Sequence, residues 1–221
     1  MDRQFIDYAE ARNLMVDGQI RPNRVYDRRL LDAMRSLPRE RFVPPHAIPL
    51  AYSDEDVPIA PGRVLMEPMA IARLIELAQV RQGERALVVG CGSGYGAALL
   101  AACGAQVTAL EQDDTLLALA RQALAGIAGV SLVGGPLRDG WPQGAPYDLL
   151  LIEGAADEVP EALIAQIRQP GGRLVGVLIG ADRIGHAGVG EPSAGGLSFR
   201  PAFDCATQVL PALRRQSGFV F

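Results

Sequence analysis

The sequence predicts an α/β fold in which a doubly wound, mainly parallel sheet follows a small N-terminal helical lobe. From residue 68 onward, short apolar runs alternate with segments of helical periodicity, the pattern of βαβ units whose sheet is covered on both faces. Before that point the apolar residues recur at helical spacing and then give way to a proline-rich stretch. We therefore place a lobe and connector at 1–66 and the sheet domain at 67–221.

The N-terminal lobe is expected to hold two helices. The first spans 8–16 and stops at Gly18, and the second spans 27–37, with Asp27 as its N-cap. Each carries its apolar residues on one face. Repeated prolines between 43 and 63 argue against any regular element there, so this segment is expected to be a surface connector.

In the sheet domain, strands and helices are expected to alternate strictly until the last stretch. There, 183–190 and 197–210 have strand character with the turn-forming sequence EPSAGG between them, which predicts an antiparallel hairpin at the end of the sheet. The remaining expected strands are 85–90, 106–111, 130–133, 147–153 and 172–180, and the expected helices are 68–80, 95–103, 113–127 and 159–169.

Composition favours an ordinary soluble globular protein, with 49% hydrophobic and 21% charged residues among 221. The net charge of −4 argues against a protein that binds nucleic-acid phosphates. No apolar run reaches the roughly 18 residues of a membrane span. The charged N-terminal stretch MDRQFIDYAEARN lacks the apolar centre of a secretory signal, so a cytoplasmic location is expected.

Several chemistries are disfavoured by residue counts. All 21 basic residues are arginine, so no lysine is present to act as a base or form a Schiff base. His46 and His186 stand far apart, and the three cysteines form no CxxC pair, which argues against a zinc site, a redox motif or a histidine-based triad. Cys91 lies in a glycine-rich loop, where it is either small filler or a nucleophile.

The glycine-rich loop GCGSGYG is the strongest functional signal. Gly90, Gly92 and Gly94 occupy the turn from the first sheet strand into its helix, where a doubly wound sheet binds ligands. Without Cβ atoms they let main-chain amides approach a ligand closely. The alternative is a tight turn that binds nothing, and Tyr95 stands where a dinucleotide fingerprint would have its third glycine.

Glu111 strengthens the case for a nucleoside. It ends the second strand, about 20 residues after the loop, where an acid can bind both ribose hydroxyls. Its alternative role is an N-cap, but Asp113 and Asp114 already supply caps for the following helix. A fourth strand YDLLLIE, a helix and the turn PGGRLV are typical of S-adenosylmethionine-dependent methyltransferases, whose cofactor is a nucleoside with an amino-acid tail.

With these motifs in place, the chain resembles the protein-L-isoaspartate O-methyltransferase family over most of its length. The resemblance lies in MVDGQIRPNRVYDRRLLDAMRSLPRERFVP, AYSDEDVPI, GCGSGYGAALLA, GWPQGAPYDLLLI and PEALIAQIRQPGGRLV. It implies a Rossmann-like class I methyltransferase fold, S-adenosylmethionine as cofactor, and isoaspartyl-containing proteins or peptides as substrates, with no nucleic acid, membrane or metal involved.

The chain departs from the family pattern at positions that the resemblance makes functional. Met66 stands where the family has a serine associated with cofactor and substrate handling, and Glu67 follows it. Val88 replaces an acid often found before the loop, and Asp56 replaces a proline. Since a thioether cannot donate a hydrogen bond, several polar contacts of the family are lost.

Two further departures fall near the expected adenine and methionine parts of the cofactor. The family's Gly-Asp-Gly turn appears as GGPLRDG, with Pro136 in the place of the aspartate and Asp139 as a possible substitute, and a threonine becomes Glu153. The residues expected to bind the cofactor are Gly90, Cys91, Gly92, Gly94, Tyr95, Glu111, Gln112, Pro136, Leu137 and Glu153.

The resemblance implies methyl transfer by in-line displacement onto a carboxylate. That carboxylate is already ionised at neutral pH, so alignment matters and no general base is required. Met66, Glu67 and Arg63 are the candidate catalytic positions, with Arg63 either meeting the substrate carboxylate or being a solvated loop charge. Three readings stay open: a working isoaspartyl methyltransferase, a methyltransferase with another acceptor, and a cofactor-binding scaffold without turnover.

Overall fold

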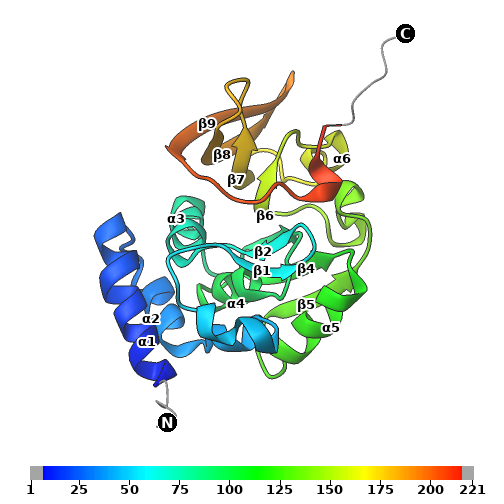
Figure 1. Ribbon diagram of the computed structural model, residues 1–221. Helices are drawn as coiled ribbons and strands as arrows, with labels where there is room; N and C mark the ends of the chain where they lie inside the picture. The colour runs from blue at the N-terminus through cyan, green and yellow to red at the C-terminus, as the bar shows by residue number, and fades with distance from the viewer. Residues whose placement is uncertain (1–6, 216–221) are drawn as a thin grey trace.

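The computed structural model describes residues 7–215, so the first six residues of the stretch examined for a targeting signal lie outside it. Its main sheet has the strand order β5-β4-β3-β6-β7-β8-β9, parallel from β5 to β7 and antiparallel at β8 and β9 (Figure 1). This confirms the predicted parallel sheet with a C-terminal hairpin. The strands are β3 (Arg85–Val89), β4 (Gln106–Glu111), β5 (Val130–Gly134), β6 (Leu149–Ala156), β7 (Arg173–Ile179), β8 (Gly185–Ser193) and β9 (Gly196–Asp204).

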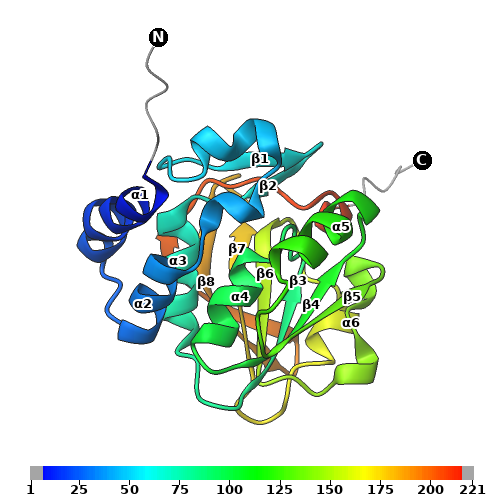
Figure 2. The same cartoon turned by 90° about the horizontal axis from the view of Figure 1, so that it is seen from below.

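Both faces of the sheet are covered, but unequally. Alternate residues of each strand point into two separate apolar cores, so that Val88 belongs to one and Leu87 to the other. The larger core packs under the N-terminal lobe and three helices, whereas the smaller one is closed by α6 and loops (Figures 1 and 2). The helices are α1 (Tyr8–Met15), α2 (Arg28–Ser36), α3 (Pro68–Ala78), α4 (Tyr95–Ala102), α5 (Asp114–Ala123) and α6 (Glu161–Ile164).

The N-terminal lobe agrees with the sequence except at the end of its first helix. The Asp27 side chain accepts a hydrogen bond from the Arg29 amide and caps α2 as predicted. The expected stop at Gly18 is wrong, because α1 continues into a π-helical turn, Val16–Ile20, and a 3₁₀ turn, Arg21–Asn23. The helical path ends at Arg24, whose φ of 64° is left-handed.

The prediction of an irregular connector over 43–63 is also wrong. This segment contains a 3₁₀ helix, Pro45–Leu50, and a two-stranded antiparallel hairpin of β1 (Val57–Ala60) and β2 (Arg63–Leu65). Proline is compatible with this hairpin because the two strands form a sheet of their own, in which each is an edge strand. Gly62, with φ of 68°, supplies the left-handed residue of its turn.

Several other elements differ in length from the prediction, α6 and the C-terminal hairpin among them. Helix α6 is only four residues long, because the chain at 166–168 leaves the helix to pair with Tyr147. The Tyr147 amide donates to the carbonyl of Gln166, and the Arg168 amide donates to that of Tyr147. Strands β8 and β9 extend through most of EPSAGG, so the turn between them is shorter than expected.

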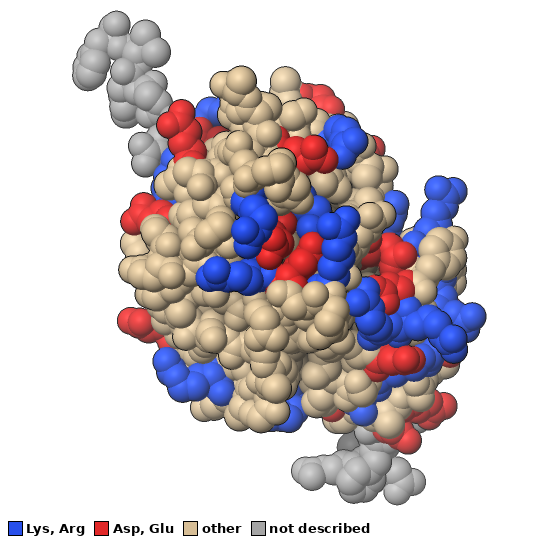
Figure 3. Space-filling model, turned by 180° about the vertical axis from the view of Figure 1, so that it is seen from behind, with Lys and Arg blue, Asp and Glu red and all other residues tan. Residues whose placement is uncertain are grey.

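On one face of the molecule, shown in Figure 3, charged side chains of both signs lie among each other. On the face in Figure 3, basic and acidic side chains lie next to each other and form no continuous basic area. None of the helices within residues 7–215 is both long and apolar enough to cross a bilayer. The cytoplasmic location stays a prediction.

Candidate cofactor site

The glycine bend, residues 90–94, joins β3 to α4 at the carboxyl edge of the parallel strands. Gly90, Gly92 and Gly94 have φ of 72°, 56° and 95°, a region that residues with a Cβ rarely adopt. The bend and the whole of α4 up to Leu100 are buried. Glycine is therefore favoured at these three positions by the backbone conformation itself.

Glu111 ends β4 beside this bend and is fully buried. The amide of Gly92 donates to its Oε2 at 2.9 Å, and the amides of Gln112 and Asp113 donate to its Oε1 at 2.8 and 3.1 Å. Three main-chain donors hold the carboxylate in one orientation. The N-cap of α5 is Asp113, so Glu111 does not fill that role.

Arg63, at the start of β2, reaches the same carboxylate from the opposite side. Its two terminal nitrogens donate to Oε1 and Oε2 of Glu111, each at 2.7 Å, and one of them also donates to the Gly90 carbonyl at 3.0 Å. The Arg63 side chain is 6% exposed. The structure thus places Arg63 against the predicted ribose-binding acid, in a buried bidentate ion pair.

Three side chains, those of Ile59, Arg63 and Leu210, cover the glycine bend, and we call them the roof. A Cβ built on Gly90 would lie 2.8 Å from Leu210, and one built on Gly92 would lie 3.0 Å from Ile59. The roof comes from the β1–β2 hairpin and from the C-terminal segment, which run beside each other in Figures 1 and 2. Pro211 lies 3.4 Å from the corresponding point on Gly62.

Glu153 is a second buried carboxyl, located in β6 and facing α4. Its Oε1 accepts a hydrogen bond from the Gly96 amide at 3.2 Å, while Oε2 has no hydrogen-bond partner among residues 7–215. Burial raises the pKa of Glu153 to about 8, although the Gly96 hydrogen bond and the charges of Arg63 and Arg39 oppose that rise. The side chain is therefore a neutral acid at pH 7.

Arg39 packs against Tyr95, a residue of the predicted cofactor site. It is fully buried, donates to the carbonyls of Ala51 and Met66 at 2.7 and 2.6 Å, and stacks over the ring of Tyr95 at 4.7 Å. Tyr95 is itself buried and meets Phe42 edge-on. The predicted cofactor position Tyr95 is thus in contact with the N-terminal lobe.

The thiol of Cys91 is fully buried in the bend, and burial raises its pKa well above the usual value, with Glu111 and Glu153 adding to that rise. A protonated thiol in this position is a poor nucleophile. The geometry therefore favours the role of small filler for Cys91.

Met66 and Glu67 lie where α3 begins. The Met66 side chain is buried, and the Glu67 amide donates to Oδ1 of Asp56 at 2.8 Å. The other oxygen of Asp56 accepts from the hydroxyl of Thr207 at 2.6 Å. Burial, together with the charges of Asp54 and Asp56, raises the pKa of Glu67.

The turn after β5 is hydrogen-bonded to Gln112, the neighbour of Glu111, and to the main chain of Glu111. The Gln112 side chain accepts a hydrogen bond from the Leu137 amide at 3.3 Å, and the Gly135 amide donates to the Glu111 carbonyl at 3.0 Å. Pro136 and Asp139 are exposed on this turn. The end of β4 is therefore hydrogen-bonded both to the bend and to this turn.

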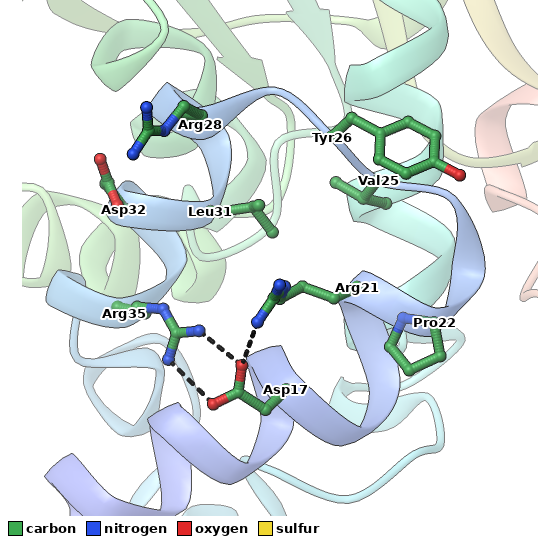
Figure 4. Close-up of a pocket in the computed structure, with 9 residues that line it drawn as sticks. All are labelled: Asp17, Arg21, Pro22, Val25, Tyr26, Arg28, Leu31, Asp32 and Arg35. Atoms are coloured by element: carbon green, nitrogen blue, oxygen red, sulfur yellow. Dashed lines mark hydrogen bonds and ion pairs between the residues drawn. The ribbon is translucent and has the colours of Figure 1, made fainter.

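A separate hollow of about 670 Å³ lies on the N-terminal lobe and includes no residue of the bend (Figure 4). Asp17 accepts hydrogen bonds there from Arg35 at 2.7 Å and from Arg21 at 3.2 Å. These ion pairs are substantially exposed, so they contribute little to stability.

The sequence predicts that the bend and Glu111 lie together, but it does not predict the cover by Ile59 and Leu210, the pairing of Arg63 with Glu111, or the Asp56 contacts. Ile59 and Leu210 carry no chemical signal, since apolar residues are ordinary in any segment. For Asp56 the sequence shows only that an acid stands where the family has a proline. The one available signal was the loss of that proline, because a carboxylate in its place can bind both a main-chain amide and a hydroxyl.

The donor set fits S-adenosylmethionine. A bare bend of main-chain groups lies next to an oriented carboxylate at the end of the second parallel strand, which suits a ribose and an amino-acid tail. What covers the bend consists of side chains and not of backbone. The group therefore fits once these side chains move aside.

Comparison with known proteins agrees with this geometry. The family model described as protein-L-isoaspartate(D-aspartate) O-methyltransferase (PCMT) matches residues 10–183. A protein-L-isoaspartate O-methyltransferase of Methylorubrum extorquens (strain PA1) is 45% identical over 170 residues, covering 76% of this chain and 74% of the relative. That of Koribacter versatilis (strain Ellin345) is 37% identical over 200 residues, covering 90% and 89%.

Solved structures support the fold. One protein-L-isoaspartate O-methyltransferase superposes with a TM-score of 0.78 at 22% identity, covering 92% of this chain and 67% of the other. A putative one from Plasmodium falciparum, solved with S-adenosyl-L-homocysteine, has a TM-score of 0.72 at 19% identity, covering 94% and 99%. Taken together with the matched family model, these findings show that the chain belongs to the protein-L-isoaspartate (D-aspartate) O-methyltransferase family.

Proposed function

We propose that this chain methylates the carboxylate of isoaspartyl residues in damaged proteins. As a member of its family it is an S-adenosylmethionine-dependent methyltransferase. The observation that carries the proposal is the buried glycine bend beside Glu111, an arrangement suited to a nucleoside cofactor. The isoaspartyl acceptor is supported by the family to which the chain belongs.

The residues of the bend and Glu111 would hold the cofactor, which supplies an activated methyl group on a sulfonium. Glu111 would bind the ribose hydroxyls, and its three main-chain donors keep it oriented for that role. The acceptor carboxylate is ionised at neutral pH, so no side chain has to remove a proton. The chain's contribution is then alignment and exclusion of water by the buried bend.

Two measurements test the proposal. Calorimetric titration with S-adenosylhomocysteine should give saturable binding. Incubation with S-adenosylmethionine and an isoaspartyl peptide should release methanol from the labile ester, while the same peptide with a normal aspartate should not. Binding without release of methanol would reject the isoaspartyl acceptor, and absence of binding would reject the cofactor role as well.

Met66→Ser is expected to raise turnover of the isoaspartyl peptide about fivefold, because a hydroxyl restores a hydrogen-bond donor worth about 1 kcal/mol. Met66 is buried at the start of α3, next to the Glu67–Asp56 contact. The measurement is the initial rate of methanol release. Met69→Ser, at the second residue of α3, serves as the control and should not increase the rate. An unchanged rate for Met66→Ser would mean that the serine position is not limiting.

A further inference from the structure

The hydrogen-bonding capacity of Glu111 is already used in full by the protein. A carboxylate offers about four lone-pair positions. Glu111 accepts from three main-chain amides and from both terminal nitrogens of Arg63. A ribose that binds Glu111 must therefore replace an existing donor, and the main-chain amides are fixed by the bend and by the start of α5.

Arg63 is the donor that can be replaced. It stands on the short β1–β2 hairpin, whereas the amides belong to the glycine bend and to the two residues between β4 and α5. Its guanidinium also donates to the Gly90 carbonyl and lies 3.8 Å from the point where a Cβ of Gly92 would stand. The guanidinium thus lies on the face of the glycine bend that a nucleoside would contact.

The surroundings of the hairpin give it space to move. An apolar hollow of about 490 Å³ adjoins it, lined by His46, Asp113, Thr115 and the hairpin residues Pro58, Ile59, Ala60 and Pro61. Ile59 faces both this hollow and the glycine bend. Because Ile59 and Arg63 belong to one hairpin, a displacement of the hairpin away from the bend would carry both side chains off it together.

We propose that Arg63 is an internal competitor of the cofactor: its ion pair with Glu111 must open, and the β1–β2 hairpin must move off the glycine bend, before S-adenosylmethionine binds. This inference rests on the proposed function, because it assumes the same cofactor and the same acid. The apparent dissociation constant is then the intrinsic one divided by the fraction of molecules in which the pair is open. Arg63 thereby sets the cofactor concentration at which the enzyme works.

The test is calorimetric titration of S-adenosylhomocysteine into the wild-type chain and into Arg63→Ala and Arg63→Lys. We expect Arg63→Ala to bind at least tenfold more tightly. Arg63→Lys should fall between the two, because a lysine retains the charge but loses the bidentate geometry. Glu111 remains held by its three amides in each variant, which keeps the ribose position intact.

Arg173→Ala is the matched control. Arg173 also forms a largely buried bidentate pair, with Glu84, at the opposite edge of the sheet. Its loss should lower the melting temperature as the loss of Arg63 does, while the dissociation constant stays at the wild-type value. A general loosening of the fold would instead change both variants alike and would overturn the proposal.

Hydrogen exchange on the wild-type chain provides a second readout that needs no substitution. Ligands usually increase protection, but here the amides of 57–65 should exchange faster when S-adenosylhomocysteine is bound, since the hairpin leaves the bend. Unchanged protection there, or equal or weaker binding by Arg63→Ala, overturns the competition while leaving the proposed function in place. Absence of binding to all the variants rejects the cofactor role and this inference together.

Discussion

Replacement of Glu153 by glutamine should make the protein more stable in neutral and alkaline solution. In the folded chain the pKa of Glu153 is raised from 4.5 to about 8 by burial, so between these values only the folded state holds the proton. Wild-type stability therefore falls as pH rises, by about 1.4 kcal/mol per pH unit within that window. A glutamine does not titrate and removes this slope.

The expected gain of Glu153→Gln over wild type increases by about 3 kcal/mol between pH 5.5 and pH 8. Urea unfolding at several pH values measures it directly. Glu191→Gln is the control, because Glu191 forms an exposed pair with Arg200 on the hairpin, and its curve should run parallel to that of wild type. Parallel curves for Glu153→Gln would show instead that the buried acid is already ionised in the fold.

Arg39→Ala is expected to destabilise the chain by about 4 kcal/mol. It leaves the buried carbonyls of Ala51 and Met66 without their donor, at about 1–3 kcal/mol each, and removes the contact with the Tyr95 ring. The measurement is the midpoint of urea unfolding. Arg41→Ala, an exposed position in the same 3₁₀ helix, should change stability by less than about 0.5 kcal/mol.

A loss for Arg39→Ala no greater than that of Arg41→Ala would mean that water satisfies these carbonyls in the variant. Arg39→Lys should recover only part of the stability. A lysine carries one nitrogen, while Arg39 uses two different nitrogens to reach two carbonyls that belong to separate segments.

The fold was predictable because its signals are local. Buried parallel strands produce continuous apolar runs, and Gly90, Gly92 and Gly94 stand at a turn that only glycine adopts readily. Glu111 could be placed because the carboxyl ends of neighbouring parallel strands meet at one edge of the sheet. The strands and the bend need only the residue and its near neighbours in the sequence, whereas Glu111 also needs the rule for how parallel strands align.

What the sequence did not predict depends on contacts between distant segments. Arg63 and Glu111 are 48 residues apart, and a guanidinium in a proline-rich segment has no feature that announces a buried partner. The short α6 depends likewise on competition from Tyr147, whose main chain takes the hydrogen bonds that a longer helix would use. Helix propensity gives only the local preference of residues 159–169, and the pairing of this segment with Tyr147 overrides that preference.

The contact between Gly96 and Glu153 constrains how this chain can vary. A Cβ on Gly96 would lie 2.6 Å from the Glu153 carboxyl, so the smallest side chain at 96 collides with the acid at 153. Among relatives the two sites should therefore vary together, because a side chain at 96 requires the Glu153 carboxyl to shift or to be replaced by a smaller group. A design that places a larger side chain at position 96 should therefore also replace Glu153 by a smaller residue.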